Sequence, residues 1–248
     1  MRYAKGFTVW ELLAVVIIFV VLAAILFPVF VGSRQGSPYR SCESNLKLLE
    51  LGMIQYEQDY DQRLPLRQMN APHLVSWRAL IYPYLKSKTI YVCPSDPAAK
   101  WPDVEQDGFM RSYAVNSSTG GNSGGPFSDN HPRLALVYAS TPASTIALVE
   151  STAAFNDFNP LFPAAFAQPT RQGYRTGHLF AGHQGMTNMM FLDGHCKSIK
   201  PDQLFPGNSL YGRRNPWTID GSAFSPADQA TAKSTLEYAG TQDQNLSR

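Results

Sequence analysis

Apolar residues dominate one stretch near the start of the sequence. Residues 7–31 read FTVWELLAVVIIFVVLAAILFPVFV and contain a single charged residue, Glu11. A helix of this length rises roughly 38 Å, at about 1.5 Å per residue, whereas the hydrocarbon core of a bilayer is about 30 Å thick. Arg2 and Lys5 precede the stretch without an acidic residue. Because basic residues keep their flank in the cytoplasm, the pattern predicts a single-pass membrane helix with an exported remainder.

Two plainer interpretations of this stretch fit less well. A cleaved secretory signal peptide has a shorter apolar core followed by a small-x-small cleavage site, which residues 28–31 (PVFV) do not provide. A plain membrane anchor does not need Glu11, since a carboxylate at the centre of a membrane helix costs about 2.5–3.5 kcal/mol. We therefore expect Glu11 to have a function.

The residues that follow predict a break and then a second helix. Gly32, Gly36 and Pro38 favour an interruption after the apolar stretch. From about Tyr39 to Tyr60, apolar side chains recur at alternating spacings of four and three residues: Cys42, Leu46, Leu49, Met53, Tyr56 and Tyr60. Such spacing is typical of an amphipathic helix, and we expect this face to pack in the core of a globular head.

Beyond Leu64, prolines separate short segments. We expect strands at residues 89–93, 134–138 and 145–150, a turn or two of helix at 77–85, and a mobile Gly-rich loop at 117–126. A β-hairpin is predicted over residues 188–199, because Asp193-Gly194 between two apolar segments favours a type I′ turn. The polar end of the chain predicts a short helix from Pro226 to about Ala239.

Composition narrows the functional classes. The chain has 248 residues, of which 44% are hydrophobic and 16% charged, with a net charge of +2. It lacks the clustered basic excess of nucleic-acid-binding proteins, so we expect no nucleic-acid partner. The sequence contains no His-Glu-x-x-His and no phosphate-binding loop, so we do not expect an enzyme.

Residues 5–13 (KGFTVWELL) resemble the N-terminal signature of type IV prepilins and type II secretion pseudopilins. The resemblance implies that a prepilin peptidase cleaves after Gly6, where no side chain obstructs the protease. It also implies N-methylation of the new N-terminal Phe7, with Glu11 at the fifth mature position. Pro28 falls where pilin helices commonly carry a proline.

The implied cleavage gives Glu11 a physical role. It leaves a charged amine on Phe7, at a helix end that is already positive. The Glu11 carboxylate of one subunit can neutralise the amine of its neighbour in a filament, because buried charges cost far less in pairs than alone. Glu11 would then set the register of assembly. Val9-Trp10 departs from the Leu-Ile that the family usually has there.

Further stretches resemble a prepilin-type group, abundant in planctomycete-like bacteria, that is defined by a His-x9-Asp-Gly C-terminal region. In this chain His183 precedes Asp193-Gly194 with nine residues between His183 and Asp193. The other matching stretches are residues 41–47, 93–96 and 112–116. The resemblance covers the chain from about Lys5 to Ile199 and assigns the His-x9-Asp-Gly motif no role.

Pattern and resemblance together imply an α+β pilin-like fold. Its long N-terminal helix would span the membrane in its first half and pack against a small antiparallel β-sheet head. The expected segments are a leader (1–6), a transmembrane and assembly helix (7–31), an amphipathic stem (32–62), an α+β head with the Gly-rich loop (63–204) and a polar C-terminal extension (205–248).

The function that the resemblance implies is structural. The processed subunit would join a type II secretion pseudopilus or a type IV pilus-like filament. Its partners would be the prepilin peptidase, a filament assembly platform, and its own copies and other pilin-like subunits. It would lie in the bacterial inner membrane with a cytoplasmic N-terminus, and then in a periplasmic or surface filament. Two alternatives stay open: a pilin-anchored surface- or ligand-binding module, and a minor capping subunit, which the large head favours.

Cysteines suggest a cross-link in the head. Cys42, Cys93 and Cys196 are the only cysteines, and an exported head would permit a disulfide. We expect Cys42 to pair with Cys93, which would contribute about 4 kcal/mol by closing a loop of about fifty residues. Three free thiols are the alternative.

Four residues have side chains of the kinds that bind zinc: His178, His183, His195 and Cys196. In an extended strand His183 and Asp193 would lie about 30 Å apart, so only a sharp bend around Gly185 could join them. Asp193 is better explained by the turn. We therefore predict no metal site and no cofactor. Structural calcium, known in major pseudopilin heads, has no matching ligand motif here.

Overall fold

The computed structural model describes residues 8–69, 75–96, 108–131, 133–152, 157–161, 168–171, 174–176, 179–205 and 214–242. The side chains of residues 26–39, 168–171, 174–176 and 241–242 lie outside this description. The chain divides into two compact units, Met1–Arg40 and Ser41–Arg248, which we call the N-terminal unit and the head.

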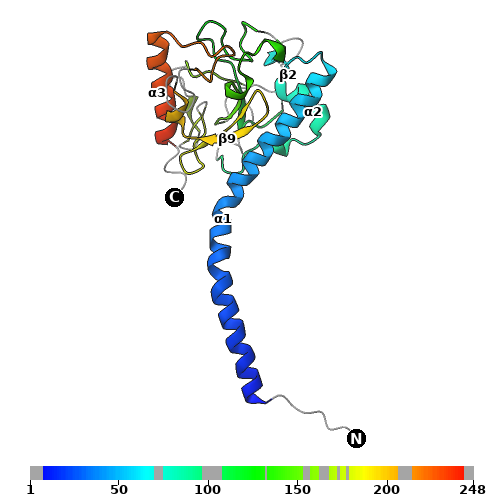
Figure 1. Cartoon of the computed structure of the whole chain (residues 1–248), viewed down its shortest axis with the longest axis vertical. Coiled ribbons are helices and arrows are strands. Elements are labelled where there is room, and N and C mark those ends of the chain that lie inside the picture. Colours follow the sequence, from blue (N-terminus) through cyan, green and yellow to red (C-terminus); the bar gives the residue numbers. More distant parts are fainter. Residues whose placement is uncertain are drawn as a thin grey trace. The chain divides into compact units, whose positions relative to one another are not determined.

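Figure 1 shows the helices and strands of the described residues. The α-helices are α1 (Val9–Asp59), α2 (Trp77–Leu85) and α3 (Pro226–Gln242). The strands are β1 (Gln68–Met69), β2 (Val75–Ser76), β3 (Tyr113–Asn116), β4 (Ile146–Glu150), β5 (Asp157–Phe158), β6 (Gln168–Arg171), β7 (Tyr174–Thr176), β8 (Thr187–Phe191) and β9 (Cys196–Ile199). Short 3-10 helices are η1 (Thr89–Tyr91), η3 (Leu136–Tyr138), η4 (Pro142–Ser144) and η6 (Pro201–Leu204).

Helix α1 is continuous from Val9 to Asp59, so the predicted interruption between Gly32 and Pro38 is wrong. In a helix interior, glycine costs about 1 kcal/mol and proline about 3 kcal/mol relative to alanine. Starting a second helix would cost about 4 kcal/mol, because the nucleation constant is on the order of 10⁻³. A continuous helix also keeps the hydrogen bonds that a break would lose, so the local penalties do not suffice to end it.

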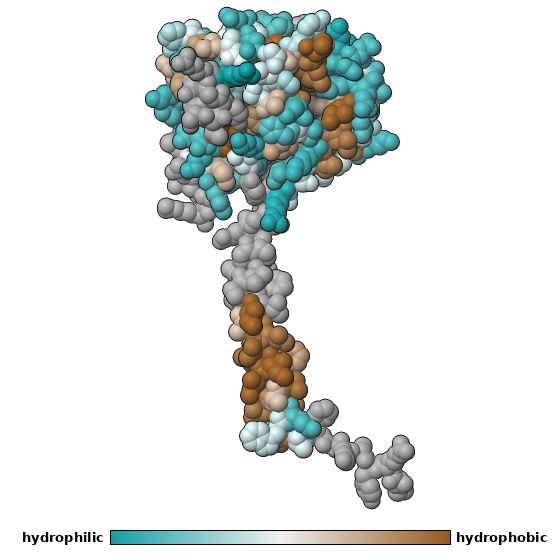
Figure 2. All heavy atoms as spheres, viewed as in Figure 1, coloured by the Kyte–Doolittle hydropathy of each residue, from teal (hydrophilic) through white to brown (hydrophobic). Residues whose placement is uncertain are grey.

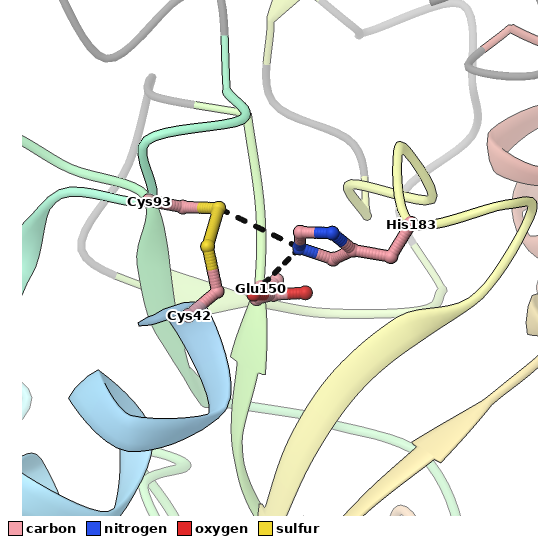
Figure 3. A group of neighbouring side chains, drawn as sticks. All are labelled: Cys42, Cys93, Glu150 and His183. Atoms are coloured by element: carbon pink, nitrogen blue, oxygen red, sulfur yellow. Dashed lines mark hydrogen bonds and ion pairs between the residues drawn. A yellow bond between two sulfur atoms is a disulfide. The ribbon is translucent and has the colours of Figure 1, made fainter. Parts of the chain in front are cut away.

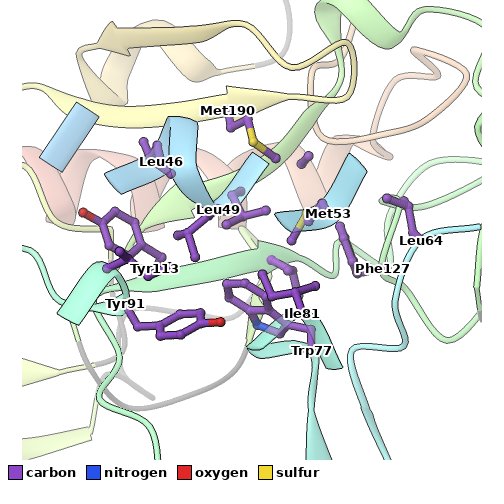
Figure 4. Close-up of a cluster of buried hydrophobic side chains, with 14 of the residues drawn as sticks. Leu46, Leu49, Met53, Leu64, Trp77, Ile81, Tyr91, Tyr113, Phe127 and Met190 are labelled. Atoms are coloured by element: carbon purple, nitrogen blue, oxygen red, sulfur yellow. The ribbon is translucent and has the colours of Figure 1, made fainter. Parts of the chain in front are cut away.

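In the head, one face of α1 is buried as its spacing predicts. Cys42, Leu46 and Leu49 are fully buried, and Met53 and Tyr56 are at most 4% exposed. Figure 4 shows this face in a cluster with side chains from α2 and β3. Tyr60, the last member of the predicted stripe, lies beyond the helix end and is 44% exposed. Its ring still stacks on that of Tyr56, with 4.2 Å between the centroids.

The central sheet has five strands in the order β5-β3-β4-β8-β9. Neighbouring strands are antiparallel except β3 and β5, which are parallel. The head is therefore α+β, as predicted, although its central sheet is mixed rather than purely antiparallel. Strand β4, the β8–β9 hairpin and α2 confirm three elements expected from the sequence.

Core side chains lie on both faces of this sheet. On β3, Tyr113 and Val115 belong to the cluster that contains the buried face of α1, whereas Ala114 belongs to the cluster of α3. Since successive strand residues point to opposite faces, the sheet separates the two clusters. Figure 1 shows α3 and the head portion of α1 on opposite sides of the sheet. Covered strands carry continuous apolar runs, and all residues of β3, β4 and β8 are buried.

The polar C-terminal segment belongs to the head. Helix α3 buries Ala232, Leu236 and Ala239 in the same cluster as Trp217. At its N-terminus, Ser225 Oγ accepts a hydrogen bond from the backbone N–H of Asp228 at 3.2 Å. The predicted helix is confirmed, and it completes the second core cluster.

Two of the predicted strands are wrong. Residues 89–93 contain the 3-10 helix η1, and residues 134–138 contain η3. Tyr91 is fully buried and fills the core from η1, whereas Val137 and Tyr138 are exposed. An apolar run of five residues does not reveal whether its backbone pairs with a neighbouring strand, so this pattern alone cannot separate the two conformations.

The Gly-rich segment at residues 117–126 packs against the head instead of forming the expected mobile loop. Gly124 O accepts a hydrogen bond from the backbone N–H of Ile219 at 3.0 Å. Ser123 Oγ donates to Asp220 Oδ1 at 2.6 Å. The glycines permit this close packing of two backbone segments far apart in the sequence.

The β8–β9 hairpin closes through a three-residue loop rather than the predicted type I′ turn. The Phe191 N–H donates to His195 O at 3.0 Å, and the Gly194 N–H donates to Phe191 O at 2.9 Å. Of residues 192–194, only Gly194 has a positive φ, +91°. This pattern is a type I turn followed by a left-handed glycine, which spares Asp193 an unfavourable conformation.

Within the described part of the chain, no helix combines the length and apolar character that a membrane span requires. The span expected over residues 7–31 extends past the described side chains and stays a prediction.

Burial of Glu57 predicts a pH-dependent stability. Burial raises the pKa of Glu57 from 4.5 to about 7. In the folded protein Glu57 holds its proton to a higher pH than in the unfolded chain. The contribution of this proton to the free energy of unfolding is therefore complete below pH 4.5 and is lost as the pH rises through about 7. The loss should be roughly 1–3 kcal/mol, and Glu57→Gln should abolish it. Denaturant unfolding between pH 4 and 8 would measure it, with exposed Glu237→Gln as control; equal pH profiles of wild type and Glu57→Gln would contradict the prediction.

Candidate functional site

The N-terminal site is described only from Thr8 onward. Gly6 and Phe7 lie outside the described residues, as does the side chain of Pro28 within α1. At the start of α1, Glu11 Oε2 accepts hydrogen bonds from the Thr8 N–H at 2.7 Å and from Thr8 Oγ1 at 2.8 Å. In return, the Glu11 N–H donates to Thr8 Oγ1 at 3.4 Å. This reciprocal pattern is a capping box, in which the first and fourth residues satisfy each other's backbone donors.

The capping box was missed in the sequence, although its Thr-x-x-Glu spacing is visible there at Thr8 and Glu11. It gives Glu11 a second role beside the expected pairing with a neighbouring amine. The carboxylate is held at the positive end of the helix, where a negative charge is favourable. The two roles can be separated experimentally, because a capping box accepts glutamine in place of glutamate whereas a charge pair does not.

A second site lies inside the head, around a disulfide. Cys42 of α1 and Cys93 are joined, which is the pairing named by the sequence hypothesis; their Cα atoms are 5.2 Å apart and both residues are fully buried. Next to this link, Asn45 Nδ2 donates to Val92 O at 2.9 Å. Beyond it, the Asp96 N–H donates to Cys93 O at 3.0 Å. The disulfide thus fastens the first residues of α1 in the head to the turn that follows η1.

The disulfide contacts a buried histidine and a buried carboxylate (Figure 3). His183 Nε2 lies 3.5 Å from Cys93 Sγ and 3.2 Å from Glu150 Oε1. Glu150 is 0% exposed and His183 5% exposed. Water therefore cannot solvate either polar group, and each depends on protein partners.

Glu150 obtains those partners from the start of β8. The Asn188 N–H donates to Glu150 Oε2 at 2.8 Å, and Asn188 Nδ2 donates to Glu150 Oε1 at 3.1 Å. Sequence reasoning missed both residues. The available signal was an acidic residue, Glu150, directly after the apolar run of residues 146–149.

A tight bend brings His183 to this position. Gln184 and Gly185 both have positive φ, +57° and +79°, and His183 forms an isolated bridge with Met186. A sharp bend around Gly185, the condition under which His183 and Asp193 could meet, is therefore present. It directs His183 toward Glu150 and the disulfide, not toward Asp193.

The Asp193-Gly194 end of the motif forms a separate structure at the hairpin. Asp193 Oδ1 lies 2.6 Å from His195 Nδ1, and the His195 ring stacks on Phe191 at 4.3 Å. Gly194 lies against α1, because a Cβ at this position would overlap the carboxylate of Glu50. Burial and the charge of nearby Asp193 raise the pKa of Glu50.

The structure groups a different set of possible metal ligands from the set named from the sequence. His178 lies outside the described residues. His195 and Cys196 lie at the hairpin and are not part of the described ligand group that includes His183. Burial raises the pKa of the Cys196 thiol to about 12, which keeps it protonated and unreactive. The group around His183 consists instead of Cys42, Cys93, Glu150 and His183.

Comparisons with protein-family models, with curated proteins and with solved structures gave no match.

The disulfide predicts a large stability difference between matched variants. Replacing Cys42 and Cys93 by serine should lower the free energy of unfolding by about 4 kcal/mol, since the link closes a loop across 51 positions. Cys196→Ser is the control and should cost about 1 kcal/mol or less. Denaturant unfolding measures both. Alkylation of the unreduced, unfolded protein should label one cysteine, and labelling of all three would contradict the assignment.

Proposed function

We propose that the protein is a pilin-like structural subunit, processed after Gly6 and assembled through α1 into a pseudopilus or type IV pilus-like filament. The observation that carries the proposal is the difference in burial between the two parts of α1. Residues 8–25 are all exposed, whereas the face that begins at Cys42 is buried in the core of the head. One uninterrupted helix thus joins an unpartnered apolar segment to a folded head.

The exposed segment is too apolar to remain in water. Figure 2 shows apolar side chains along the N-terminal part of α1. Trp10, Ile18 and Ile25 are 81%, 58% and 64% exposed, and their neighbours are similar. Covering each such side chain contributes roughly 1.5–3 kcal/mol, so a partner for the whole segment is strongly favoured. We infer that lipid of the inner membrane covers it before assembly and that the same helices of other subunits cover it afterwards.

The capping box supports this assembly mode. It holds the Glu11 carboxylate against Thr8 at the first turn of α1, and Thr8 directly follows Phe7, on which cleavage would create the amine. In a stack of staggered helices, the carboxylate of one subunit can meet the amine of the next. Pairing offsets the cost of burying either charge in an apolar surrounding.

The first prediction from this proposal concerns the N-terminus of the mature protein. Intact mass spectrometry of protein extracted from membranes should find a chain that begins at N-methylated Phe7. A mature chain that begins at Met1, or one cut after Val31, would contradict the proposal. The expected result requires cells that contain a prepilin peptidase, and a peptidase-deficient strain is the control.

The second prediction separates the two roles of Glu11. Glu11→Gln keeps the capping box but removes the charge, so processing should continue while incorporation into sheared filaments falls at least tenfold. Thr8→Ala removes the capping hydroxyl but keeps the charge; it should cost the helix about 1 kcal/mol and leave incorporation near wild type. If Glu11→Gln assembles normally and Thr8→Ala does not, then Glu11 acts through the cap and not through charge pairing.

A further inference from the structure

Four metal-ligating side chains converge around the disulfide of the head. One sulfur of each of Cys42 and Cys93, a carboxylate oxygen of Glu150 and a ring nitrogen of His183 all lie within 4.8 Å of one another. All four residues are buried. We propose that in the reduced chain these side chains form a binding site for a divalent cation of the zinc type, as an alternative to the disulfide.

The spacing of the four atoms fits a tetrahedral site. Zinc binds sulfur at about 2.3 Å and nitrogen or oxygen at about 2.0–2.2 Å, so adjacent ligand atoms of a tetrahedron are about 3.3–3.8 Å apart. His183 Nε2 is 3.5 Å from Cys93 Sγ and 3.2 Å from Glu150 Oε1, which are already close to such edges. The other separations are within 4.8 Å, and after reduction the two sulfurs of the disulfide must move apart by rotation of the cysteine side chains.

The donor set is one that zinc prefers. Two thiolates, one imidazole and one carboxylate fill four positions with no place left for water, as in structural zinc sites. Asn188 supplies the outer support, because its N–H and Nδ2 hold the two Glu150 oxygens at 2.8 and 3.1 Å. Such outer contacts orient a ligand before the metal arrives. Phe180 packs against His183 edge to face and restricts its ring.

The charge of the buried group is the same in both states. With the disulfide and a neutral imidazole, the group carries the one negative charge of Glu150. With a dication and two thiolates, the added charges cancel and one negative charge again remains. Neither state therefore places additional charge in the apolar interior, where unpaired charge is costly.

The chain can exchange between the disulfide and the cation-bound state in balanced steps. Binding by the dithiol releases two thiol protons, and the imidazole proton resides on Nδ1 while Nε2 binds the cation. Oxidation requires a disulfide-type oxidant. The two thiolates give up two electrons and join, the oxidant leaves as two thiolates, and the dication is released.

The test uses the full chain in detergent, reduced with a phosphine, freed of reductant without air, and titrated with cobalt(II) alone. One equivalent of cobalt should bind, with thiolate-to-cobalt absorption in the near ultraviolet and strong tetrahedral bands in the visible range. Zinc should displace it and extinguish both. The same protein with its disulfide intact should show no thiolate bands. Either cation should also raise the unfolding temperature of the reduced chain.

Matched variants identify the ligands. His183→Ala should weaken cobalt binding by roughly tenfold or more, whereas His195→Ala should not, although both replace a histidine near the hairpin. Each variant is first folded with its disulfide intact and its fold is checked by near-ultraviolet circular dichroism before reduction. Cys42→Ser with Cys93→Ser should abolish the thiolate bands, and Cys196→Ser should preserve them.

Two outcomes would overturn the inference. The first is a reduced, folded chain that binds no cobalt with thiolate bands. The second is binding that depends on Cys196 and leaves the unfolding temperature unchanged, since this combination indicates association with loosely held side chains rather than with the folded site. Either result would leave the cleavage after Gly6 and the role of Glu11 unaffected.

Discussion

A carboxylate sealed from water at the end of β4 constrains much of the head. Glu150 is fully buried, and a charge in that position is tolerated only when hydrogen bonds replace its lost solvation. Asn188 and His183 supply them. The β4–β8 ladder runs as far as the pair Val149–Met189. At the next position, the Glu150 side chain accepts the Asn188 N–H and so ends the ladder. Satisfying one carboxylate thereby accompanies the end of the pairing between β4 and β8, whereas β8 itself continues to Thr187 through its pairing with β9.

The same constraint explains the spacing of the His-x9-Asp-Gly motif. Its first residue reaches the disulfide of Cys42, and its glycine lies against Glu50. Cys42 and Glu50 are two turns apart on α1, roughly 12 Å along the helix axis. Strand β8, between the two ends of the motif, spans a similar length at about 3.3 Å per residue. The motif therefore places His183 against the disulfide that holds α1 and Gly194 of the hairpin against α1 itself, and Asp193 contacts His195 in the same turn.

Local patterns in the sequence predicted the local structures. The four-three spacing from Cys42 to Tyr56 predicted one face of one helix, and Ser225-Pro226 predicted the start of another. Both features depend only on residues that are close together in the sequence. The strand expected at residues 89–93 failed because pairing depends on a distant partner, and among the described residues no strand forms a ladder with η1. Glu150 was overlooked for the same reason. Its meaning comes from Asn188 and His183, which are 38 and 33 residues away. The continuity of α1 through Gly36 and Pro38 shows the reverse case, in which strong local signals lose to the cooperativity of a long helix.

The proposed use of α1 would give the disulfide a mechanical role. A filament or membrane anchor would transmit force along this helix, and the head begins at Ser41, one residue before Cys42. Hydrogen bonds and apolar contacts at a helix end open easily, because each is worth only about 1 kcal/mol or a little more. A covalent link at Cys42, the first buried residue of α1 among the side chains that the structure describes, would pass the load to Cys93, and Asn45 adds a second contact to the adjoining Val92. Force along α1 would then act on the whole core cluster from Leu46 to Tyr56 at once, instead of opening the helix one turn after another. A cation held by the same cysteines would join the same two segments, so the junction would be closed in either state.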